Sequence, residues 1–258
     1  MHPLSMDRIY FQNSRHLTLV GCFHPADSKA AIVMAHGFTN DKSSQGRFDA
    51  LAESFNQNGY NVLRFDFSGC GESSADILST HNMIDDLHCA LEFVKKNGCT
   101  TVGLYGHSLG GFICLKCDDP AIRTMVLTGA PTDYMKYDWT DYYSEEQLRE
   151  IRAKGYLTAK DRSGQDRLIG RQLLRSFEEI NQRELLSGVR CPILLIHGND
   201  PNDWEETQLL EKSKKGIDYL PVGSQLDIID GANHTFREHL DRVIAEANTW
   251  YSKYLPLR

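Results

Sequence analysis

Long hydrophobic runs are missing from this sequence of 258 residues. A helix that crosses a membrane needs about 18 consecutive apolar residues, whereas the longest apolar stretches, such as Ala30–Ala35, have only the length of a β-strand. The N-terminal segment includes Asp7 and Arg8 and contains no continuous apolar block, so it does not match a secretory signal. We therefore expect no contact with membranes and a cytoplasmic location.

An excess of basic residues is also missing. The chain has 28 Lys and Arg against 35 Asp and Glu, which gives a net charge of −7, and it has no basic stripe. Proteins that bind nucleic acids neutralise phosphates with clustered basic side chains, so we expect no nucleic-acid partner. A content of 41% hydrophobic and 24% charged residues is ordinary for a globular protein and argues against disorder, collagen and coiled coils.

Cysteines at metal-binding or disulfide spacing are lacking as well. The seven cysteines are an odd number and are scattered along the chain. The one close pair, Cys114 and Cys117, has neither a second pair nor a histidine cluster at zinc-binding spacing. We expect reduced cysteines in the core, with no disulfide framework, no metal site and no cofactor.

What the sequence does contain is an alternation of apolar, strand-length runs with segments of helical periodicity. The apolar runs lie at 9–12, 17–23, Ala30–Ala35, 60–65, 101–105, 124–128, 192–197 and Gln225–Ile229. Between them, apolar residues recur every three or four positions, for example in 83–94 and 236–254. Continuous apolar strands indicate burial on both faces of a sheet. The sequence therefore predicts an α/β protein with a mostly parallel eight-stranded sheet and helices on both faces.

One segment interrupts this alternation. About 60 residues separate the strand that ends near Thr128 from the strand that begins at Pro192, whereas a crossover connection needs only about a dozen. Within this segment, 144–154 and 171–180 look helical and 155–170 resembles a hairpin. We expect a single domain over residues 1–258, with a small cap insertion at about 132–188.

The candidate nucleophile lies in Gly106-His107-Ser108-Leu109-Gly110, which matches G-x-S-x-G. A strand at 101–105 precedes this pentapeptide and a helix follows it, and the nucleophile elbow requires this strand–turn–helix arrangement. Glycines flank the serine because its backbone is strained and neighbouring chain segments come close. Ser108 is therefore the candidate nucleophile.

Together with four other segments, this elbow resembles the α/β-hydrolase family, specifically its serine esterase and peptidase-like members with a cap insertion. The resemblance covers roughly residues 30–254. The other matching segments are His36-Gly37-Phe38, the D-x-x-G-x-G-x-S loop at 66–73, His197-Gly198 and Gly231-Ala232-Asn233-His234. The resemblance implies the α/β-hydrolase fold and a serine hydrolase activity.

A hydroxyl is a poor nucleophile at neutral pH and needs a base, for which His234 is the candidate. It follows the last strand, and Thr235-x-x-Glu238 reads as a capping box at the start of the next helix. This position puts the imidazole at the carboxyl edge of the sheet, where the elbow also projects. His234 is therefore expected to accept the proton of Ser108.

The acid of the triad is open between two aspartates. The family usually carries Asp three residues after the Gly of His-Gly, but Pro201 occupies that position here. Asp203-x-x-Glu206 also reads as a helix cap, which would engage the Asp203 carboxylate with backbone N–H groups. We favour Asp200, which remains free to orient the imidazole, with Asp203 as the alternative and Asp133 as a remote third choice.

The resemblance also implies an oxyanion hole made of two backbone N–H groups, those of Leu109 and Phe38. His36 and Asp66 are expected to order their loops. His107, as the variable residue of the elbow, is expected to shape the substrate pocket.

Aromatic residues crowd the opening of the insertion, with Tyr134, Tyr137 and Trp139 as candidate substrate contacts. They could line a pocket for an aryl group or pack the insertion onto the sheet. The insertion carries eleven Lys and Arg against ten Asp and Glu between Tyr134 and Arg190, unlike the apolar lid of a lipase. This composition favours a soluble substrate of modest size.

The reading that agrees with all these features is a serine hydrolase, specifically a carboxylesterase, that cleaves a small acyl or aryl ester through an acyl-enzyme. A thioesterase, amidase or peptidase would use the same residues, and a non-catalytic ligand-binding protein with this fold stays an alternative. The expected partner is a small-molecule ester, and assembly as a homodimer stays open.

Overall fold

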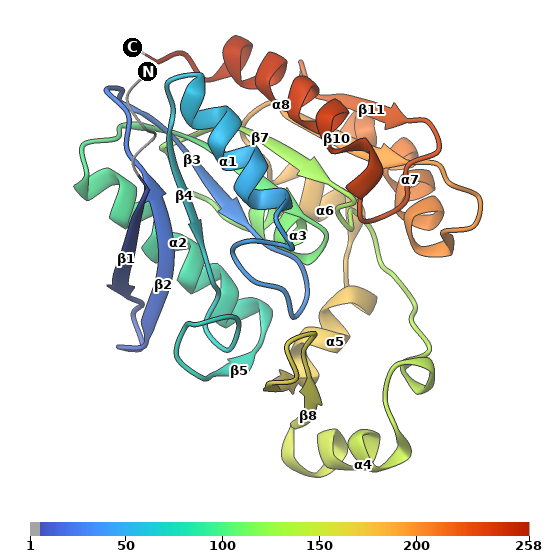
Figure 1. The fold of residues 1–258 in the computed structure, drawn as a ribbon. Coiled ribbons are helices and arrows are strands. Elements are labelled where there is room, and N and C mark those ends of the chain that lie inside the picture. The colour runs from blue at the N-terminus through green and yellow to red at the C-terminus, as the bar shows by residue number, and fades with distance from the viewer. Residues whose placement is uncertain (1–5, 258) are drawn as a thin grey trace.

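The computed structural model describes residues 6–257, and its centre is an eight-stranded sheet (Figure 1). The order across the sheet is β1-β2-β4-β3-β6-β7-β10-β11. These strands are β1 (Asp7–Gln12), β2 (Thr18–His24), β3 (Ala30–Ala35), β4 (Asn61–Phe65), β6 (Thr101–His107), β7 (Ile122–Thr128), β10 (Ile193–Gly198) and β11 (Gln225–Ile229). Only β1 with β2 and β2 with β4 pair antiparallel; the remaining neighbours are parallel. The predicted mostly parallel sheet is confirmed.

Helices cover both faces of this sheet, because its central strands are apolar on both sides. Along β3, Ala31 and Val33 belong to one hydrophobic cluster, whereas Ile32 and Met34 belong to the other. The first cluster includes side chains of α2 (Thr80–Lys96), α3 (Leu109–Leu115) and α7 (Trp204–Gly216), and the second those of α1 (Arg47–Gln57) and α8 (Leu240–Tyr254). The seven cysteines are free thiols, and all except the half-buried Cys89 are buried.

The insertion between β7 and β10 has its own secondary structure and projects at the lower edge of Figure 1. It contains η1 (Trp139–Asp141), α4 (Glu145–Lys154), β8 (Tyr156–Lys160), β9 (Asp166–Gly170), α5 (Arg171–Glu178) and α6 (Gln182–Ser187). The β8–β9 hairpin forms a second sheet with β5 (Ile77–Leu78). The Arg167 guanidinium donates to the carbonyls of Gly69 and Gly71, at 3.3 and 3.1 Å, which ties the hairpin to the loop after β4.

The helix after His234 begins later than the sequence predicts. A 3₁₀ turn, η3 (Arg237–His239), precedes α8, and α8 itself begins at Leu240. The predicted Thr235-x-x-Glu238 capping box is wrong, because Phe236 adopts φ 52°, in the left-handed region, and interrupts the helix. Another 3₁₀ turn, η2 (Ile217–Tyr219), follows α7.

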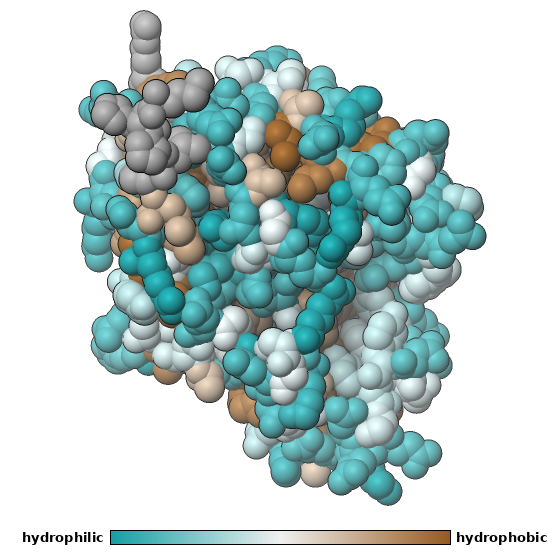
Figure 2. Space-filling view, viewed as in Figure 1, coloured by the Kyte–Doolittle hydropathy of each residue, from teal (hydrophilic) through white to brown (hydrophobic). Residues whose placement is uncertain are grey.

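The outer surface agrees with the mixed charge of the sequence. The face seen in Figure 2 is mostly hydrophilic, including the projecting insertion at its lower edge. Within residues 6–257, no helix combines the length and the apolar character that crossing a bilayer requires.

Candidate active site

Ser108 lies at a sharp turn between the end of β6 and the start of α3. Its backbone has φ 54° and ψ −123°, a conformation that costs energy for a residue other than glycine. The two flanking glycines leave no room for a side chain: a Cβ on Gly106 would lie 2.6 Å from the Cα of Gly111, and one on Gly110 would lie 2.0 Å from the carbonyl oxygen of Ala35. The local geometry therefore matches a nucleophile elbow.

His234 brings its imidazole to this serine from the loop after β11. Its Nε2 lies 2.9 Å from Ser108 Oγ, across 126 positions of sequence. The backbone N–H of His234 donates to Asp203 Oδ2 at 2.8 Å, which fixes the loop against the start of α7. The side chain of His234 is 17% exposed, so the serine–histidine pair is half-buried.

The carboxylate that contacts the imidazole is Glu206. Its Oε2 lies 2.6 Å from His234 Nδ1, and its Oε1 accepts the N–H of Gly198 at 2.9 Å and lies 2.8 Å from His197 Nδ1. Burial raises the pKa of Glu206, but its contacts with His197 and His234 outweigh burial and hold that pKa well below its usual range. Its two oxygens face only donors, the N–H of Gly198 and the Nδ1 groups of two imidazoles, so Glu206 accepts as an ionised carboxylate.

The ionised glutamate has the opposite effect on the imidazole. Burial lowers the pKa of His234, but the hydrogen bond and the negative charge of Glu206 outweigh burial and raise the pKa above its ordinary value. A histidine with a raised pKa is a stronger base, which is the property that activation of a serine requires.

Gly129 lies against the imidazole of His234 and the carboxylate of Glu206, and its lack of a side chain leaves room for both. Gly129 has φ +55°, and a Cβ there would lie 2.8 Å from His234 Nδ1 and 2.9 Å from Glu206 Oε2. The position directly after β7 therefore accepts glycine only, for both conformational and steric reasons.

Neither predicted aspartate contacts the imidazole ring, which corrects the sequence-based choice of the acid. Asp200 Oδ1 accepts the backbone and side-chain N–H groups of Asn202, at 2.9 and 3.0 Å, and so closes a turn. Asp203 caps α7 by accepting the N–H of Glu206 at 3.0 Å, as the sequence predicts, and its second oxygen holds the main chain of His234. Asp133 pairs with Lys212 at 3.8 Å.

A signal for Glu206 was nevertheless present in the sequence. Glu206, Leu209, Leu210 and Ser213 follow each other at i, i+3, i+4 and i+7, which is one face of a helix. All four side chains are buried. The helical periodicity thus indicates that Glu206 lies on the buried face of its helix, in addition to its place in the helix cap.

Of the two predicted oxyanion-hole residues, Leu109 directly follows Ser108, and Phe38 follows Gly37, which lies beside Ser108. A Cβ on Gly37 would lie 3.4 Å from the Cβ of Ser108, so the loop that carries Phe38 passes beside the serine. Leu109 is the first residue of α3, where backbone N–H groups have no partner within the helix. Within residues 6–257, neither the Phe38 nor the Leu109 N–H has an intramolecular acceptor.

His36 orders the loop before Phe38, as the sequence predicts. Its Nε2 accepts the N–H of Phe67 at 3.2 Å, so its Nδ1 carries the hydrogen and donates to the carbonyl of Gly37 at 2.8 Å. Burial lowers the pKa of His36, which keeps the ring neutral in this arrangement. Asp66 acts in the same region by accepting the backbone N–H of Lys42 at 2.6 Å.

His107 lies behind His234 and is only 6% exposed. The two rings are 5.2 Å apart, and His107 Nδ1 lies 3.0 Å from Thr128 Oγ1. Burial, with His234 nearby, lowers the pKa of His107 well below its ordinary value. His107 is therefore neutral, and its ring packs beside the ring of His234.

Five aromatic residues of the insertion form a cluster, and Tyr134 lies outside it. The cluster comprises Tyr137, Trp139, Tyr142, Tyr143 and Phe177, with ring centroids such as those of Tyr137 and Trp139 5.0 Å apart. Phe177 stacks at 6.2 Å on Phe112, which lies one turn after Ser108 in α3. Tyr134 is 52% exposed and stands outside the cluster, with Lys212 Nζ 3.9 Å from its ring centre.

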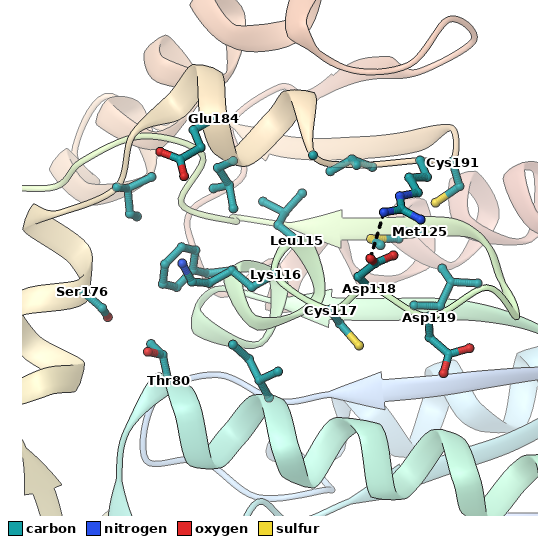
Figure 3. Close-up of a pocket in the computed structure, with 18 of the residues that line it drawn as sticks. Thr80, Leu115, Lys116, Cys117, Asp118, Asp119, Met125, Ser176, Glu184 and Cys191 are labelled. Atoms are coloured by element: carbon teal, nitrogen blue, oxygen red, sulfur yellow. Dashed lines mark ion pairs between the residues drawn. The ribbon is translucent and has the colours of Figure 1, made fainter.

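One cavity in the described residues lies away from Ser108. It measures about 770 Å³ and lies among α2, the end of α3, β7 and the α5–α6 region (Figure 3). Leu115, Lys116, Glu184 and Cys191 are among its lining residues, and Ser108, His234 and Glu206 are not. It is therefore separate from the serine–histidine–glutamate constellation.

Comparisons with known proteins agree with this geometry. The sequence model of the family described as "Serine aminopeptidase, S33" matches residues 26–155, which is 130 of 258 residues and includes Ser108 and the Phe38 loop. The human protein ABHD12B is 27% identical over 206 residues, which cover 75% of this chain and 51% of the relative. The chain thus spans about half the length of that curated relative.

Two solved structures are similar in fold. The α/β hydrolase GrgF from Penicillium sp. sh18 has a TM-score of 0.78 at 17% identity, covering 98% of this chain and 99% of its own. Est1E from Butyrivibrio proteoclasticus, solved with ferulic acid, has a TM-score of 0.73 at 19% identity, covering 96% and 99%. Given the sheet order, the elbow at Ser108 and the family match over half of its length, this chain belongs to the α/β-hydrolase family, in the group described as serine aminopeptidase, S33.

Proposed function

We propose that this α/β hydrolase is a serine carboxylesterase in which Ser108, His234 and Glu206 form the catalytic triad. The observation that carries the proposal is the continuous contact from Ser108 Oγ to His234 Nε2, at 2.9 Å, and from His234 Nδ1 to Glu206 Oε2, at 2.6 Å. Nucleophile, base and orienting acid stand in the order that acyl transfer by a serine requires.

The first half-reaction forms an acyl-enzyme. Ser108 Oγ attacks the ester carbonyl carbon while its proton passes to His234 Nε2, and the carbonyl oxygen becomes an oxyanion that accepts the N–H groups of Leu109 and Phe38. His234 then donates the proton to the departing alkoxide oxygen, and the C–O bond of the ester breaks. Glu206 stabilises the imidazolium that exists between these two proton transfers.

The second half-reaction hydrolyses the acyl-enzyme. A water molecule gives a proton to His234 Nε2 and attacks the same carbonyl carbon. Collapse of the oxyanion releases the carboxylic acid, and the proton returns from His234 to Ser108 Oγ. At the end of the two half-reactions, Ser108, His234 and Glu206 have the protonation states with which they began.

An aryl or small acyl ester is the substrate that the surroundings favour. The aromatic cluster connects through Phe177 to Phe112, which lies one turn after Ser108 in α3. Est1E, which shares the fold, was solved with ferulic acid, an aromatic acid. The hydrophilic surface of the insertion in Figure 2 supports a soluble ester over a lipid aggregate.

A second candidate is cleavage of an amide next to a free amino group. Glu205 accepts a hydrogen bond from the hydroxyl of Tyr137 at 2.7 Å. Such a carboxylate at the edge of the aromatic cluster could pair with a substrate ammonium group. The family description names aminopeptidases, which agrees with this alternative.

One panel of substrates tests both candidates. Purified protein is assayed with p-nitrophenyl esters of increasing acyl length, with methyl esters of aromatic acids and with aminoacyl p-nitroanilides. The carboxylesterase proposal expects turnover of esters, covalent labelling of Ser108 by a fluorophosphonate, and loss of both in Ser108→Ala. Preference for anilides would favour the aminopeptidase candidate, and labelling of another residue would refute both.

A further inference from the structure

Glu206 contacts two imidazoles, and the proposed mechanism uses only one of them. Its Oε2 faces His234, whereas its Oε1 lies 2.8 Å from Nδ1 of His197, the last residue but one of β10. His197 is completely buried, as is Glu206. The contact between His197 and the proposed acid Glu206 therefore has no function in the proposed mechanism as described so far.

The contacts continue beyond His197 into the core. His197 Nε2 lies 2.9 Å from the hydroxyl of Ser213 on α7, and that hydroxyl lies 3.0 Å from Thr132 Oγ1. Ser213 and Thr132 are also completely buried. A chain of four polar side chains therefore runs from Thr132 to Glu206 without access to water.

Counting the hydrogens in this chain assigns the protonation state of His197. An ionised carboxylate only accepts, so Nδ1 of His197 carries a hydrogen. If Nε2 also carried one, Ser213 would accept it and donate to Thr132, and the buried hydroxyl of Thr132 would have no acceptor among the described residues. If Nε2 is bare, Thr132 donates to Ser213 and Ser213 donates to His197, so every hydrogen has an acceptor.

The length of the glutamate side chain makes a second anchor useful. Glu206 reaches His234 from within α7, whereas an aspartate in a loop would have one fewer rotatable bond to restrain. Its Oε1 is fixed by two donors, the N–H of Gly198 and Nδ1 of His197, so that Oε2 alone points at His234. Restricting that freedom in advance is what a positioning residue contributes.

We propose that His197 is a neutral positioning residue that holds the Glu206 carboxylate against His234 without cancelling its charge. The inference rests on the proposed triad, in which that charge stabilises the imidazolium of His234. A cationic residue at this place would pair with Glu206 and weaken its effect on His234. A neutral N–H donor fixes the geometry and leaves the charge for catalysis.

The experiment compares two substitutions of His197 by full pH profiles of kcat and kcat/KM on an activated ester. His197→Phe removes the donor, whereas the amide of His197→Asn keeps a neutral N–H near the position of Nδ1. We expect about 10- to 100-fold loss of kcat in H197F with little change in KM, from the loss of one buried hydrogen bond to a charged group. The acid limb of kcat/KM should also move to lower pH, and H197N should recover most of the lost rate.

The control for replacing a buried histidine is His24→Phe. His24 lies on β2, 7% exposed and outside the constellation around Ser108. We expect H24F to lower the melting temperature while leaving the acid limb in place. H197F that lowers only the melting temperature, with an unchanged acid limb, would overturn the positioning role.

A spectroscopic measurement on the unmodified protein keeps the inference testable if H197F fails to fold. With ¹⁵N-labelled histidine, assigned through Ser213→Ala, His197 should show one protonated ring nitrogen throughout the pH range of activity. Two protonated ring nitrogens on His197 would overturn the proposal.

Glu206→Gln, measured alongside, separates the two proposals. If E206Q retains full activity, the triad proposal fails. If E206Q is inactive while H197F matches the unmodified protein in rate and pH profile, only the role of His197 fails.

Discussion

Replacing Glu206 by glutamine tests the triad most directly, because the surrounding donors dictate how the new amide would be oriented. Two N–H groups, those of Gly198 and His197, point at Oε1. The amide oxygen of glutamine would therefore occupy the Oε1 position, since an NH₂ group there would face two donors. The NH₂ group would then face Nδ1 of His234.

This orientation inverts the tautomer of His234. With an NH₂ group opposite, Nδ1 must accept, so the ring hydrogen moves to Nε2, which now faces Ser108 Oγ at 2.9 Å. A protonated Nε2 cannot take the proton of the serine. The same tautomer error in a serine protease lowers kcat by about 10⁴-fold, and we expect a loss of that order for E206Q.

The assay is ester hydrolysis with the rate of fluorophosphonate labelling as a second readout, since labelling also needs an activated Ser108. Asp200→Asn is the matched carboxylate-to-amide control, because the Asp200 carboxylate accepts hydrogen bonds from Asn202 and lies outside the contacts of His234. E206Q should fold with normal circular dichroism and lose both readouts, whereas D200N should keep them. Activity of E206Q within about threefold of the unmodified protein would refute the assignment.

Three further outcomes follow from the same geometry. Gly129→Ala should lower kcat strongly, because its Cβ would lie within 3 Å of both His234 Nδ1 and Glu206 Oε2; normal kinetics would contradict the packing described here. Asp203→Ala should lower the melting temperature by about 2–4 °C, from a lost cap worth about 1 kcal/mol, and cost less activity than E206Q; thermal melts and ester assays check both parts. Because the pKa of His234 is raised above 6.5 and the base must be unprotonated, kcat/KM should fall as the pH drops, with its midpoint above 6.5. A pH profile with a midpoint below 6.5 would disagree with that direction.

The fold and the serine–histidine pair could be predicted because both depend on short segments fixed at strand ends. Gly106 and Gly110 are required by contacts with the chain at Gly111 and Ala35, so the elbow is encoded within five consecutive residues. His234 follows β11 in the loop that leads back across the same sheet edge. A residue that follows a strand end by only a few positions has little freedom to lie elsewhere.

The start of α8 shows where local patterns stop being sufficient. Thr235-x-x-Glu238 has the letters of a capping box, but Phe236 between them has φ 52°. Left-handed backbone at a phenylalanine is unfavourable in isolation and is set by tertiary packing, here by burial of Phe236 in the cluster with α1 and α8. Helix propensity and the spacing of capping residues do not predict a left-handed backbone at such a position.

The expectation that an aspartate contacts the imidazole of His234 is wrong for a related reason. The segment between Gly198 and Trp204 is a turn closed by Asp200, with Asp203 N–H donating to the Asp200 carbonyl at 3.0 Å. Counting positions after Gly198 therefore did not locate the carboxylate that contacts His234. The helix that follows is regular, and there the periodicity places Glu206 on the buried face with Leu209 and Ser213. A carboxylate on an otherwise buried stripe is too costly to leave unpaired. Its partners must then be donors brought by other segments, which in this fold are the two imidazoles and the N–H of Gly198.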